Sequence, residues 1–283
     1  RLLEPAELLA RTCALFAAGP LAGVPVLLTA GPTREPIDPV RFVGNRSSGK
    51  MGFALAAALR DAGATVTLVA GPVALASPAG VSRVDVETAA EMHAAVMARV
   101  RDCAIFVACA AVADYRPDAP AAGKIKKSAE RLTLDLVRNP DILAEVAALA
   151  GAPFTVGFAA ETERLVELAE AKRRAKGLDL IAANLVGGTE GGFEVDENAL
   201  TVLWEGGGET LERAPKTELA RALAALIARR FRDSAGTPAT RGDGRNRAVS
   251  HEEREPNAPR SGSPRPEGLS APAPTTRPCG ILA

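Results

Sequence analysis

The chain has 283 residues, which is enough for one large domain or two small ones. Apolar residues make up 47% of the chain but aromatic residues only 4%, so Ala, Val and Leu must fill the core. Its 34 Lys and Arg residues balance 34 Asp and Glu residues, which removes any electrostatic argument for nucleic acid or an anionic membrane as a partner. The four cysteines form no C-x-x-C pair, and no stretch resembles a membrane span or a signal peptide, so we expect a reduced, cytoplasmic protein.

Short apolar runs rich in β-forming residues alternate with helical periodicity from Val24 to about Arg232. We expect strands at Val24–Ala30, Thr65–Ala70, Arg83–Val86, Ala104–Ala110, Phe154–Phe158 and Leu178–Ala183. Helices are expected at Gly52–Ala62, Ala89–Arg101, Asp141–Ala150 and Thr162–Lys176, where apolar residues recur at i, i+3 and i+4. Because the strands are apolar almost throughout, both faces of the sheet must be covered, which predicts an α/β fold with a Rossmann-like parallel sheet flanked by helices.

Two segments depart from this alternation. Leu132–Val137 alternates strictly between apolar and polar residues, which predicts a strand with one face exposed or paired. Ala199–Trp204 and Glu209–Ala214, joined by a glycine-rich turn, predict a C-terminal β-hairpin, and a last helix is expected from about Pro215 to Phe231. Residues 233–283 are rich in Pro, Arg, Ser, Gly and Thr and poor in apolar residues, so we expect a disordered tail.

The first polar cluster follows the first strand and ends at a helix start, where residues 45–51 read NRSSGKM. In open α/β sheets ligands bind at the carboxyl ends of the strands, and a helix N-terminus there offers free N–H groups to an anion. Ser47 and Ser48 add hydroxyl donors, and Gly49 lets a ligand approach the backbone. The segment matches G-x-x-x-x-G-K, but Met51 stands where a P-loop needs Ser or Thr. We therefore reject a P-loop and predict a phosphate site; the competing interpretation is a capped helix.

Two further features lie beyond the strand at Ala104–Ala110. Asp114, at the strand end, is suited to bind a hydroxyl or a metal ion, and the competing interpretation is a residue that caps a turn. The loop after it carries Lys124–Lys127. Clustered lysines on a mobile lid suit closure over a triphosphate, whereas the competing interpretation is a solvated basic loop.

The third cluster is built from strand-to-helix joints on the same sheet edge. Residues 139–142 and 157–162 lie at these joints, and Lys172 and Lys176, four residues apart, share one helix face. The competing interpretation of the two lysines is an exposed surface pair. The chain's two histidines lie on a predicted helix and in the tail, so His-based acid–base catalysis is not expected.

Together these segments resemble the phosphopantothenate–cysteine ligase family, the synthetase half of the bifunctional coenzyme A biosynthesis flavoprotein. The resemblance extends from about Pro20 to Arg232 and is carried by six motifs in the expected order. They read TAGPTREPIDPVRFVGNRSSGKMG, CAAVADYRP, KIKK, NPDIL, GFAAET and LDLIAANLV. Six ordered motifs over some two hundred residues make the resemblance specific.

The resemblance implies a ligase that condenses 4′-phosphopantothenate with cysteine through an acyl-cytidylate, using CTP and Mg²⁺ and releasing CMP and pyrophosphate. It also implies a homodimer, with LTLDLV and the lid in the interface. Residues 1–20 are similar to the connector that follows a flavin-dependent decarboxylase domain, and 21–232 would form the ligase domain. We therefore expect either a fragment of a bifunctional protein or a naturally separate ligase, and in both cases no FMN and no decarboxylase activity in this chain.

The resemblance also assigns residues. Asn45 corresponds to an asparagine linked to turnover of the acyl intermediate, and Arg41 and Lys124 complete the catalytic set, Lys124 as the lid lysine. Gly44 departs from the family, which commonly has Ser there. With the predicted phosphate site included, the nucleotide is expected to bind Gly31, Ser47, Ser48, Gly49, Ala110, Asp114, Lys124, Pro140, Asp141, Ile142, Leu143, Phe158, Lys172 and Lys176. Asp114 is also the candidate metal ligand.

Two other classes of function compete with the ligase. An NAD(P)-dependent reductase of the short-chain type needs Tyr-x-x-x-Lys, but Ala119 occupies the lysine position after Tyr115, and no G-x-G-x-x-G fingerprint is present at the first strand. A non-catalytic nucleotide-binding module remains the third hypothesis. The residues leave the choice between CTP and ATP open.

Overall fold

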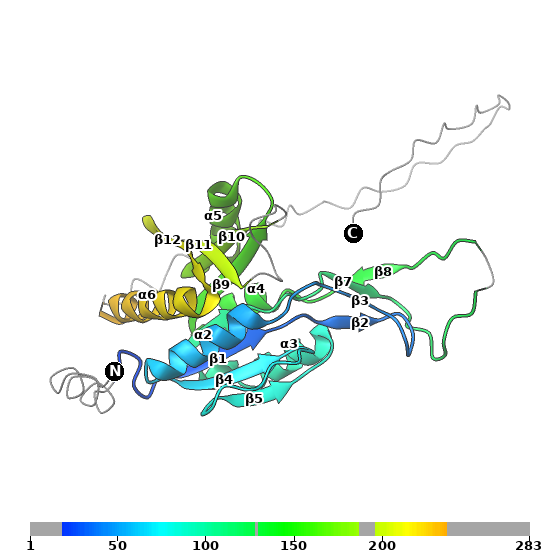
Figure 1. Cartoon of the computed structure of the whole chain (residues 1–283), viewed down its shortest axis with the longest axis horizontal. Coiled ribbons are helices and arrows are strands. Elements are labelled where there is room, and N and C mark those ends of the chain that lie inside the picture. Colours follow the sequence, from blue (N-terminus) through cyan, green and yellow to red (C-terminus); the bar gives the residue numbers. More distant parts are fainter. Residues whose placement is uncertain (1–18, 128–129, 187–195, 237–283) are drawn as a thin grey trace, which may run out of the picture. The chain divides into compact units, whose positions relative to one another are not determined.

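The computed structural model describes residues 19–127, 130–186 and 196–236 (Figure 1). The predicted connector, except for its last two residues, lies outside these ranges, as do Cys13 and Cys279. So does the predicted disordered tail, except for residues 233–236. These four belong to the last helix, so the predicted boundary at Asp233 was a few residues too early. Within the described ranges no helix has the length and hydropathy needed to cross a membrane.

A single eight-stranded sheet organises the chain, in the order β12-β11-β10-β9-β6-β1-β4-β5. Six strands pair in parallel: β1 (Pro25–Ala30), β4 (Thr65–Ala70), β5 (Ser82–Asp85), β6 (Ile105–Ala108), β9 (Phe154–Glu161) and β10 (Leu180–Leu185). The predicted hairpin is β11 (Glu197–Trp204) with β12 (Gly207–Pro215), and it joins β10 antiparallel. The structure thus confirms an α/β fold with a mostly parallel sheet.

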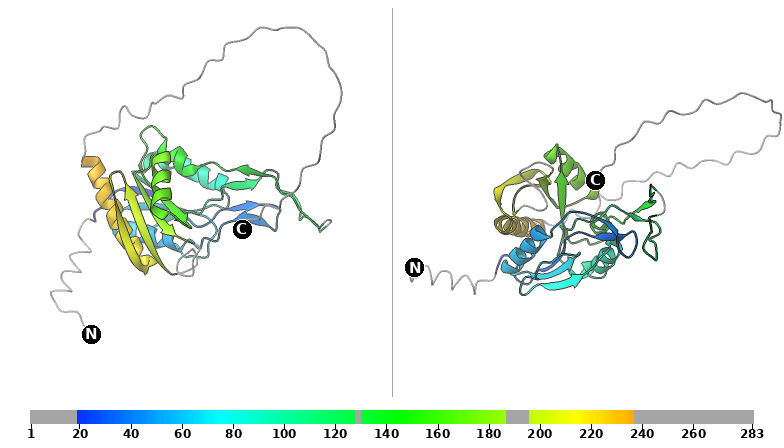
Figure 2. Two further views of the ribbon diagram at one scale, coloured as in Figure 1. Left: turned by 90° about the horizontal axis from the view of Figure 1, so that it is seen from above. Right: turned by 45° about the vertical axis from the view of Figure 1, so that its right-hand side comes forward.

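Helices cover both faces of this sheet (Figures 1 and 2). One face packs against α2 (Lys50–Asp61) and α6 (Lys216–Gly236). The other packs against α3 (Ala89–Met97), α4 (Ile142–Ala147) and α5 (Leu165–Lys176). Adjacent residues of β1 show the division: Leu28 lies in the cluster with α2 and α6, and Leu27 in the cluster with α3 and α4. Because helices cover both faces of the sheet, the strands are apolar almost throughout.

Several predicted boundaries shift for local reasons. Predicted helix Ala89–Arg101 ends at Met97, and a single 3₁₀ turn, Val100–Asp102, follows. Asp141 is the N-cap of α4 rather than its first residue, because its carboxylate accepts a hydrogen bond from the N–H of Ala144. Strand β9 continues to Glu161, three residues beyond the prediction, and so displaces the start of α5.

Two short ribbons extend from the carboxyl ends of β1 and β6 and lie together in Figure 1. The first pairs β2 (Arg34–Pro36) with β3 (Phe42–Gly44), and the second pairs β7 (Tyr115–Pro117) with β8 (Leu136–Arg138). The predicted strand Leu132–Val137 was wrong over most of its length, since only its last two residues belong to β8. Its leucines are exposed, and no described element of the chain covers them.

Candidate functional site

Two adjoining cavities open at the carboxyl edge of the parallel strands. The α2–α6 cavity has a volume of about 360 Å³ and is lined by Asn45, residues 47–52, 109–112, Asp114, 158–160, Asn184, Asn198, Leu200 and Lys216. The α4–α5 cavity has a volume of about 780 Å³ and is lined by Thr29, Ala108, Ala110, residues 112–115, 138–143, Phe158, Lys172 and Lys176. The two cavities share Ala110, Val112, Asp114 and Phe158, so ligands bound in them would meet at these residues.

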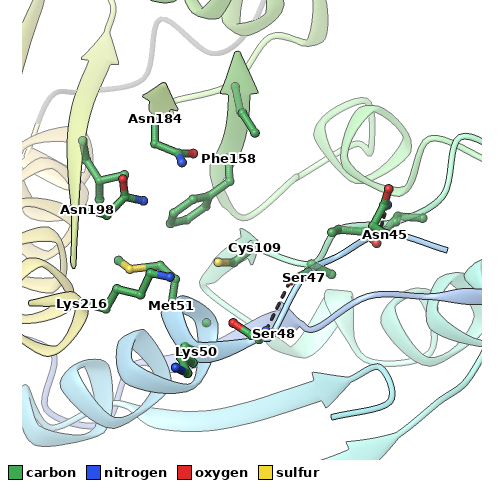
Figure 3. Close-up of a pocket in the computed structure, with 18 of the residues that line it drawn as sticks. Asn45, Ser47, Ser48, Lys50, Met51, Cys109, Phe158, Asn184, Asn198 and Lys216 are labelled. Carbon is green, nitrogen blue, oxygen red and sulfur yellow. Dashed lines mark hydrogen bonds between the residues drawn. The ribbon is translucent and has the colours of Figure 1, made fainter. Parts of the chain in front are cut away.

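The start of α2 forms one wall of the α2–α6 cavity (Figure 3). Gly49 is its N-cap with φ of 75°, a conformation that favours glycine, and no side chain caps the helix. Ser47 Oγ accepts from the N–H of Gly49 at 3.3 Å. The interpretation of this segment as a side-chain-capped helix is therefore not supported, and the first N–H groups of α2 lie at the cavity wall.

Asn45 lies between ribbon β2–β3 and α2. Its Nδ2 donates to the carbonyl of Ala111 at 3.0 Å, and the same carbonyl accepts from the N–H of Thr33 at 3.2 Å. The amide is thus attached to the segment after β6, beside the residues that both cavities share. The residue is exposed, so its amide can meet a reacting group.

Ion pairs order the polar side of the α4–α5 cavity. Lys176 Nζ lies 2.7 Å from Asp141 Oδ2, and Lys172 Nζ lies 2.6 Å from Glu161 Oε1. Burial by itself would raise the pKa of Asp141, but hydrogen bonds from Lys176 and the Ala144 N–H, with nearby positive charge, hold that pKa below its ordinary value. Both lysines thus line the cavity in ion pairs, although the side chain of Lys172 is 51% exposed, as the competing interpretation expects.

Asp38 joins the first ribbon to the predicted lid. Its carboxylate is buried and accepts from Arg41 Nη2 at 2.5 Å and from the N–H of Ile125 at 3.1 Å. Arg41 Nη2 also donates to the carbonyl of Ile125 at 3.0 Å. The Arg41 guanidinium, together with N–H donors, holds the pKa of Asp38 well below its ordinary value although burial would raise it. Both the N–H and the carbonyl group of Ile125, the residue after Lys124, are therefore held by hydrogen bonds.

Most of the predicted site residues line these cavities, but three do not. Gly31 is buried behind the helix start, where its Cα would lie 3.4 Å from a Cβ on Gly49. Arg41 is bound to Asp38, and Lys124 is exposed on the lid. The functional roles of all the predicted site residues stay predictions.

The sequence analysis overlooked three polar residues of the α2–α6 cavity: Asn184, Asn198 and Lys216. Asn184 lies within the motif LDLIAANLV, and Lys216 opens the predicted last helix, so both had a signal in the sequence. Asn198 had none, since it precedes the predicted strand Ala199–Trp204, and only the fold shows that β11 begins at Glu197 and joins β10.

Neither a nucleophilic thiolate nor a metal cage emerges from the described residues. Burial raises the pKa of Cys109, which lines the α2–α6 cavity, to about 12, so the thiol stays protonated at neutral pH. Burial likewise raises the pKa of Cys103 to about 11. Residues 19–127, 130–186 and 196–236 contain no group of three His, Cys, Asp or Glu side chains placed to hold a metal ion. Asp114, exposed between the cavities, can contribute one ligand to an ion carried by phosphates.

Comparisons with known proteins agree with this architecture. The family model described as DNA/pantothenate metabolism flavoprotein C-terminal domain matches residues 21–231. The coenzyme A biosynthesis bifunctional protein CoaBC of Vibrio cholerae is 53% identical over 230 residues, which are 80% of this chain and 58% of the relative. CoaBC of Escherichia coli K12 is 50% identical over 236 residues, 82% of this chain and 58% of the relative.

A similar solved structure is also a CoaBC protein. The crystal structure of the C-terminal domain of a CoaBC protein is 37% identical, with a TM-score of 0.65, and the match covers 76% of this chain and 99% of that one. The chain spans 58% of the length of the two curated relatives named above. The comparisons confirm the resemblance drawn from the six motifs and give no support to the reductase or the non-catalytic module. The chain belongs to the family of DNA/pantothenate metabolism flavoprotein C-terminal domains.

Proposed function

We propose that this chain is an acid–amino-acid ligase that condenses 4′-phosphopantothenate with cysteine, driven by CTP. The observation that carries the proposal is the pair of cavities that meet at Ala110, Asp114 and Phe158. A two-step ligase must bring a carboxylate and a nucleotide α-phosphate together. Two cavities with a shared wall provide that arrangement. The name of the CoaBC relatives, a coenzyme A biosynthesis bifunctional protein, supports the same role.

The nucleotide fits the α4–α5 cavity. Its volume of about 780 Å³ is within the range of small-molecule sites, and its two lysines are positive charges for phosphate oxygens. Nine of the residues expected to bind nucleotide line it: Ala110, Asp114, Pro140, Asp141, Ile142, Leu143, Phe158, Lys172 and Lys176. Lys124, tethered through Ile125, would close over the triphosphate from the lid.

The acid fits the α2–α6 cavity, which holds Asn45 and residues 47–49. In the first step its carboxylate oxygen attacks the α-phosphate of CTP, and pyrophosphate leaves. In the second step the amino group of cysteine attacks the acyl carbon, an amide bond forms, and CMP leaves with the electron pair of the broken anhydride bond. Asn45 Nδ2, which carries a second N–H beside the one bonded to Ala111, would donate to the acyl oxygen and position the intermediate for the amine.

Charge neutralisation, rather than a strong base, is what this chemistry requires. Mg²⁺ would enter with the triphosphate and supply part of that charge, with Asp114 as the candidate protein ligand. The protonated Cys109 has no covalent role in the proposal. No FMN is assigned to this chain; a flavin-dependent decarboxylase domain, in a longer protein, would carry it.

We further propose that the protein acts as a homodimer. Val40, Phe42, Leu132, Leu134 and Leu136 all lie in the two ribbons or the segment before β8, and their exposed fractions range from 36% to 60%. Several large exposed apolar side chains in one region are typical of a surface that another chain covers.

The proposed activity is tested by pyrophosphate release. The full chain, mixed with CTP, Mg²⁺ and 4′-phosphopantothenate, should show a single-turnover burst, and cysteine should convert the burst into continuous turnover. Absence of pyrophosphate release under all these conditions would overturn the proposal. Thermal shifts with CTP, ATP, GTP and UTP measure base preference, and the largest is expected with CTP.

Asn45→Asp separates an enzyme from a nucleotide-binding module. The variant should keep the CTP-dependent thermal shift, because the α4–α5 cavity is intact. Amide formation should fall about 100-fold or more, the usual scale for loss of a positioned polar group at a reacting carbonyl. If amide formation is undiminished, the assigned role of Asn45 is wrong.

A further inference from the structure

The wall that the two cavities share is a short stretch of chain outside the helices and strands. Strand β6 ends at Ala108, and residues 110–114 continue beyond it and line both cavities. A backbone that has left its sheet has N–H and carbonyl groups without ladder partners, so other groups must bind them. The hydrogen bonds to this stretch therefore decide how the two cavities meet.

Thr33 holds the stretch from the side of β1. The residue is fully buried, and its Oγ1 accepts from the N–H of Ala113 at 3.0 Å. The N–H of Thr33 donates to the carbonyl of Ala111 at 3.2 Å, which is the carbonyl that Asn45 also binds. A hydroxyl in the core is tolerated where it has such a partner. Thr33 thus fixes two residues of the shared wall, and with them the backbone to which Asn45 is attached.

Asn139 holds the same stretch from the side of α4. Its Nδ2 donates to the carbonyl of Ala113 at 2.8 Å, and its N–H donates to the carbonyl of Asp114 at 2.8 Å. Its Oδ1 accepts from Nη1 of Arg116 at 3.0 Å, and this contact orients the amide. The N–H of Ala113 is therefore bound by one side chain and its carbonyl by another, and the two come from opposite sides of the wall.

We propose that Thr33 and Asn139 are positioning residues for the ligase reaction. They hold Ala113 between them, and so place Asp114 and the backbone bound by Asn45 where the acid can attack the nucleotide. The inference rests on the proposed function and deepens it, since neither residue has a role there. Attack requires reacting atoms that lie about 3–3.5 Å apart and are aligned, so a small shift of the wall lowers the rate even when both substrates still bind.

Thr33→Val is the direct test, because valine keeps the shape of the side chain and removes the acceptor for the N–H of Ala113. We expect kcat for pyrophosphate release to fall about 10- to 100-fold, the scale of the loss when reacting groups are misplaced. The KM for CTP should stay nearly unchanged, because Lys172 and Lys176 still line the α4–α5 cavity. Thr33→Ser keeps the hydroxyl and should retain most of kcat.

Thr155→Val is the matched control. Thr155 is also buried, and its Oγ1 donates to Asp179 Oδ2 at 3.1 Å and accepts from the N–H of Asp179 at 3.2 Å. It lines neither of the two cavities, so the control should lower the free energy of unfolding and leave kcat as it is. If Thr33→Val loses no more kcat than this control, or if Thr33→Ser loses as much as Thr33→Val, the hydroxyl of Thr33 does not position the wall.

Asn139→Ala tests the other side of the wall and decides the question if Thr33→Val does not fold. It should lower kcat over the same range with the KM for CTP nearly unchanged, and an unchanged kcat would overturn the proposal. The double variant of Thr33→Val and Asn139→Ala should lose less than the product of the two single losses, because both side chains act through Ala113. Combined with Thr155→Val instead, Asn139→Ala should lose as much kcat as it does alone. Losses that multiply in the first pair would show that the two residues act independently and not on a common wall.

Failure of the proposed reaction is recognised separately. If the unmodified chain releases no pyrophosphate, hydrogen exchange followed by mass spectrometry still reports on the wall. Exchange in residues 110–116 should be faster in Thr33→Val and in Asn139→Ala than in the unmodified chain, and unaltered by Thr155→Val. That result supports the hold on the wall without the ligase. Exchange as slow in both variants as in the unmodified chain refutes it.

Discussion

The layered body and the arm of this molecule hold their apolar residues in opposite ways. We define the body as the eight-stranded sheet with its helices, and the arm as ribbons β2–β3 and β7–β8 with the segments between their strands. In the body, Leu28, Leu68 and Phe106 are fully buried by the chain itself. In the arm, Phe42 is 50% and Leu132 57% exposed. The body is therefore stable through its own packing, whereas the arm depends on polar contacts and, in the proposed homodimer, on the surface of a partner.

The polar contacts of the arm are few but concentrated. The carboxylate of Asp38 accepts from the N–H groups of Val40, Arg41 and Ile125 and from the Arg41 guanidinium. One buried carboxylate thus fixes both a turn and the lid. We therefore expect substitutions in the body to alter stability, and substitutions in the arm to alter activity or association.

The largest effect on stability is expected in the body. Leu28→Ala leaves a cavity between β1 and helices α2 and α6, and should lower the free energy of unfolding by about 2–5 kcal/mol. Urea unfolding followed by circular dichroism measures this loss. At 25 °C the folded variant should retain its KM for CTP, because Leu28 does not line either cavity. A loss below 1 kcal/mol would break the distinction between body and arm.

In the arm, Asp38→Asn should affect catalysis first. The amide keeps the size of the carboxylate but lacks its charge, so Arg41 and the N–H of Ile125 lose their common acceptor. We expect kcat for pyrophosphate release to fall about 10- to 100-fold, since hydrogen bonds to charged groups are worth about 1.5–3 kcal/mol. Trypsin should also cut faster at Lys124 to Lys127, which reports the freed lid directly.

Asp85→Asn is the matched control for that variant. Asp85 pairs with Arg83 at 2.7 Å on an edge strand and lines neither of the two site cavities. It should leave both kcat and the rate of trypsin cleavage as they are. If Asp38→Asn behaves like this control in both measurements, Asp38 does not position the lid.

Leu134→Lys addresses the exposed surface of the arm. A lysine there would have to be desolvated in a dimer interface, so we expect the dimer dissociation constant to rise about 10-fold or more, with the melting temperature of the monomer unchanged. Sedimentation velocity over a concentration series gives the dissociation constant. Val166→Lys, which alters another exposed apolar residue on α5, should leave association unaffected. Equal association of both variants would place the interface elsewhere.

The same contrast explains how far sequence reasoning reached. Apolar periodicity predicted β1, β4 and α2 closely, because in the body each apolar position reflects burial within the chain. It failed at Leu132–Val137, where the alternation reflects no burial by the described chain. It also missed β2 and β3, whose three residues each are too few to show a period. Ribbons of this size are defined by the turn at Asp38, not by a pattern.

The candidate site shows the same limit. Helix starts and strand ends can be recognised from sequence patterns, so residues Ser47 to Gly49 and Pro140 to Leu143 were predicted as site residues. Both segments do line the cavities. The cluster of Lys216 and Asn198 was not predicted. These residues come from the last helix and from a strand added antiparallel to the sheet, and only tertiary packing brings them to the start of α2.

The smallest effect is expected for acid stability in the body. On α5, Glu170 pairs with Arg173 and Arg174, and hydrogen bonds from these arginines lower its pKa to about 2 from an ordinary value of 4.5. A carboxylate whose pKa is lower in the folded state contributes stability above its unfolded pKa, and that contribution disappears as pH falls through the folded value. The free energy of unfolding should therefore fall between about pH 4.5 and 2.

Glu170→Gln should flatten this fall and, at pH 7, cost no more than about 1 kcal/mol, since such pairs near the surface contribute little. Thermal melts from pH 7 to pH 2.5 compare the two proteins. An equally steep acid loss in the variant would assign it to other carboxylates, with Asp38 of the arm the next to test, because the pKa of that buried group is lowered as well.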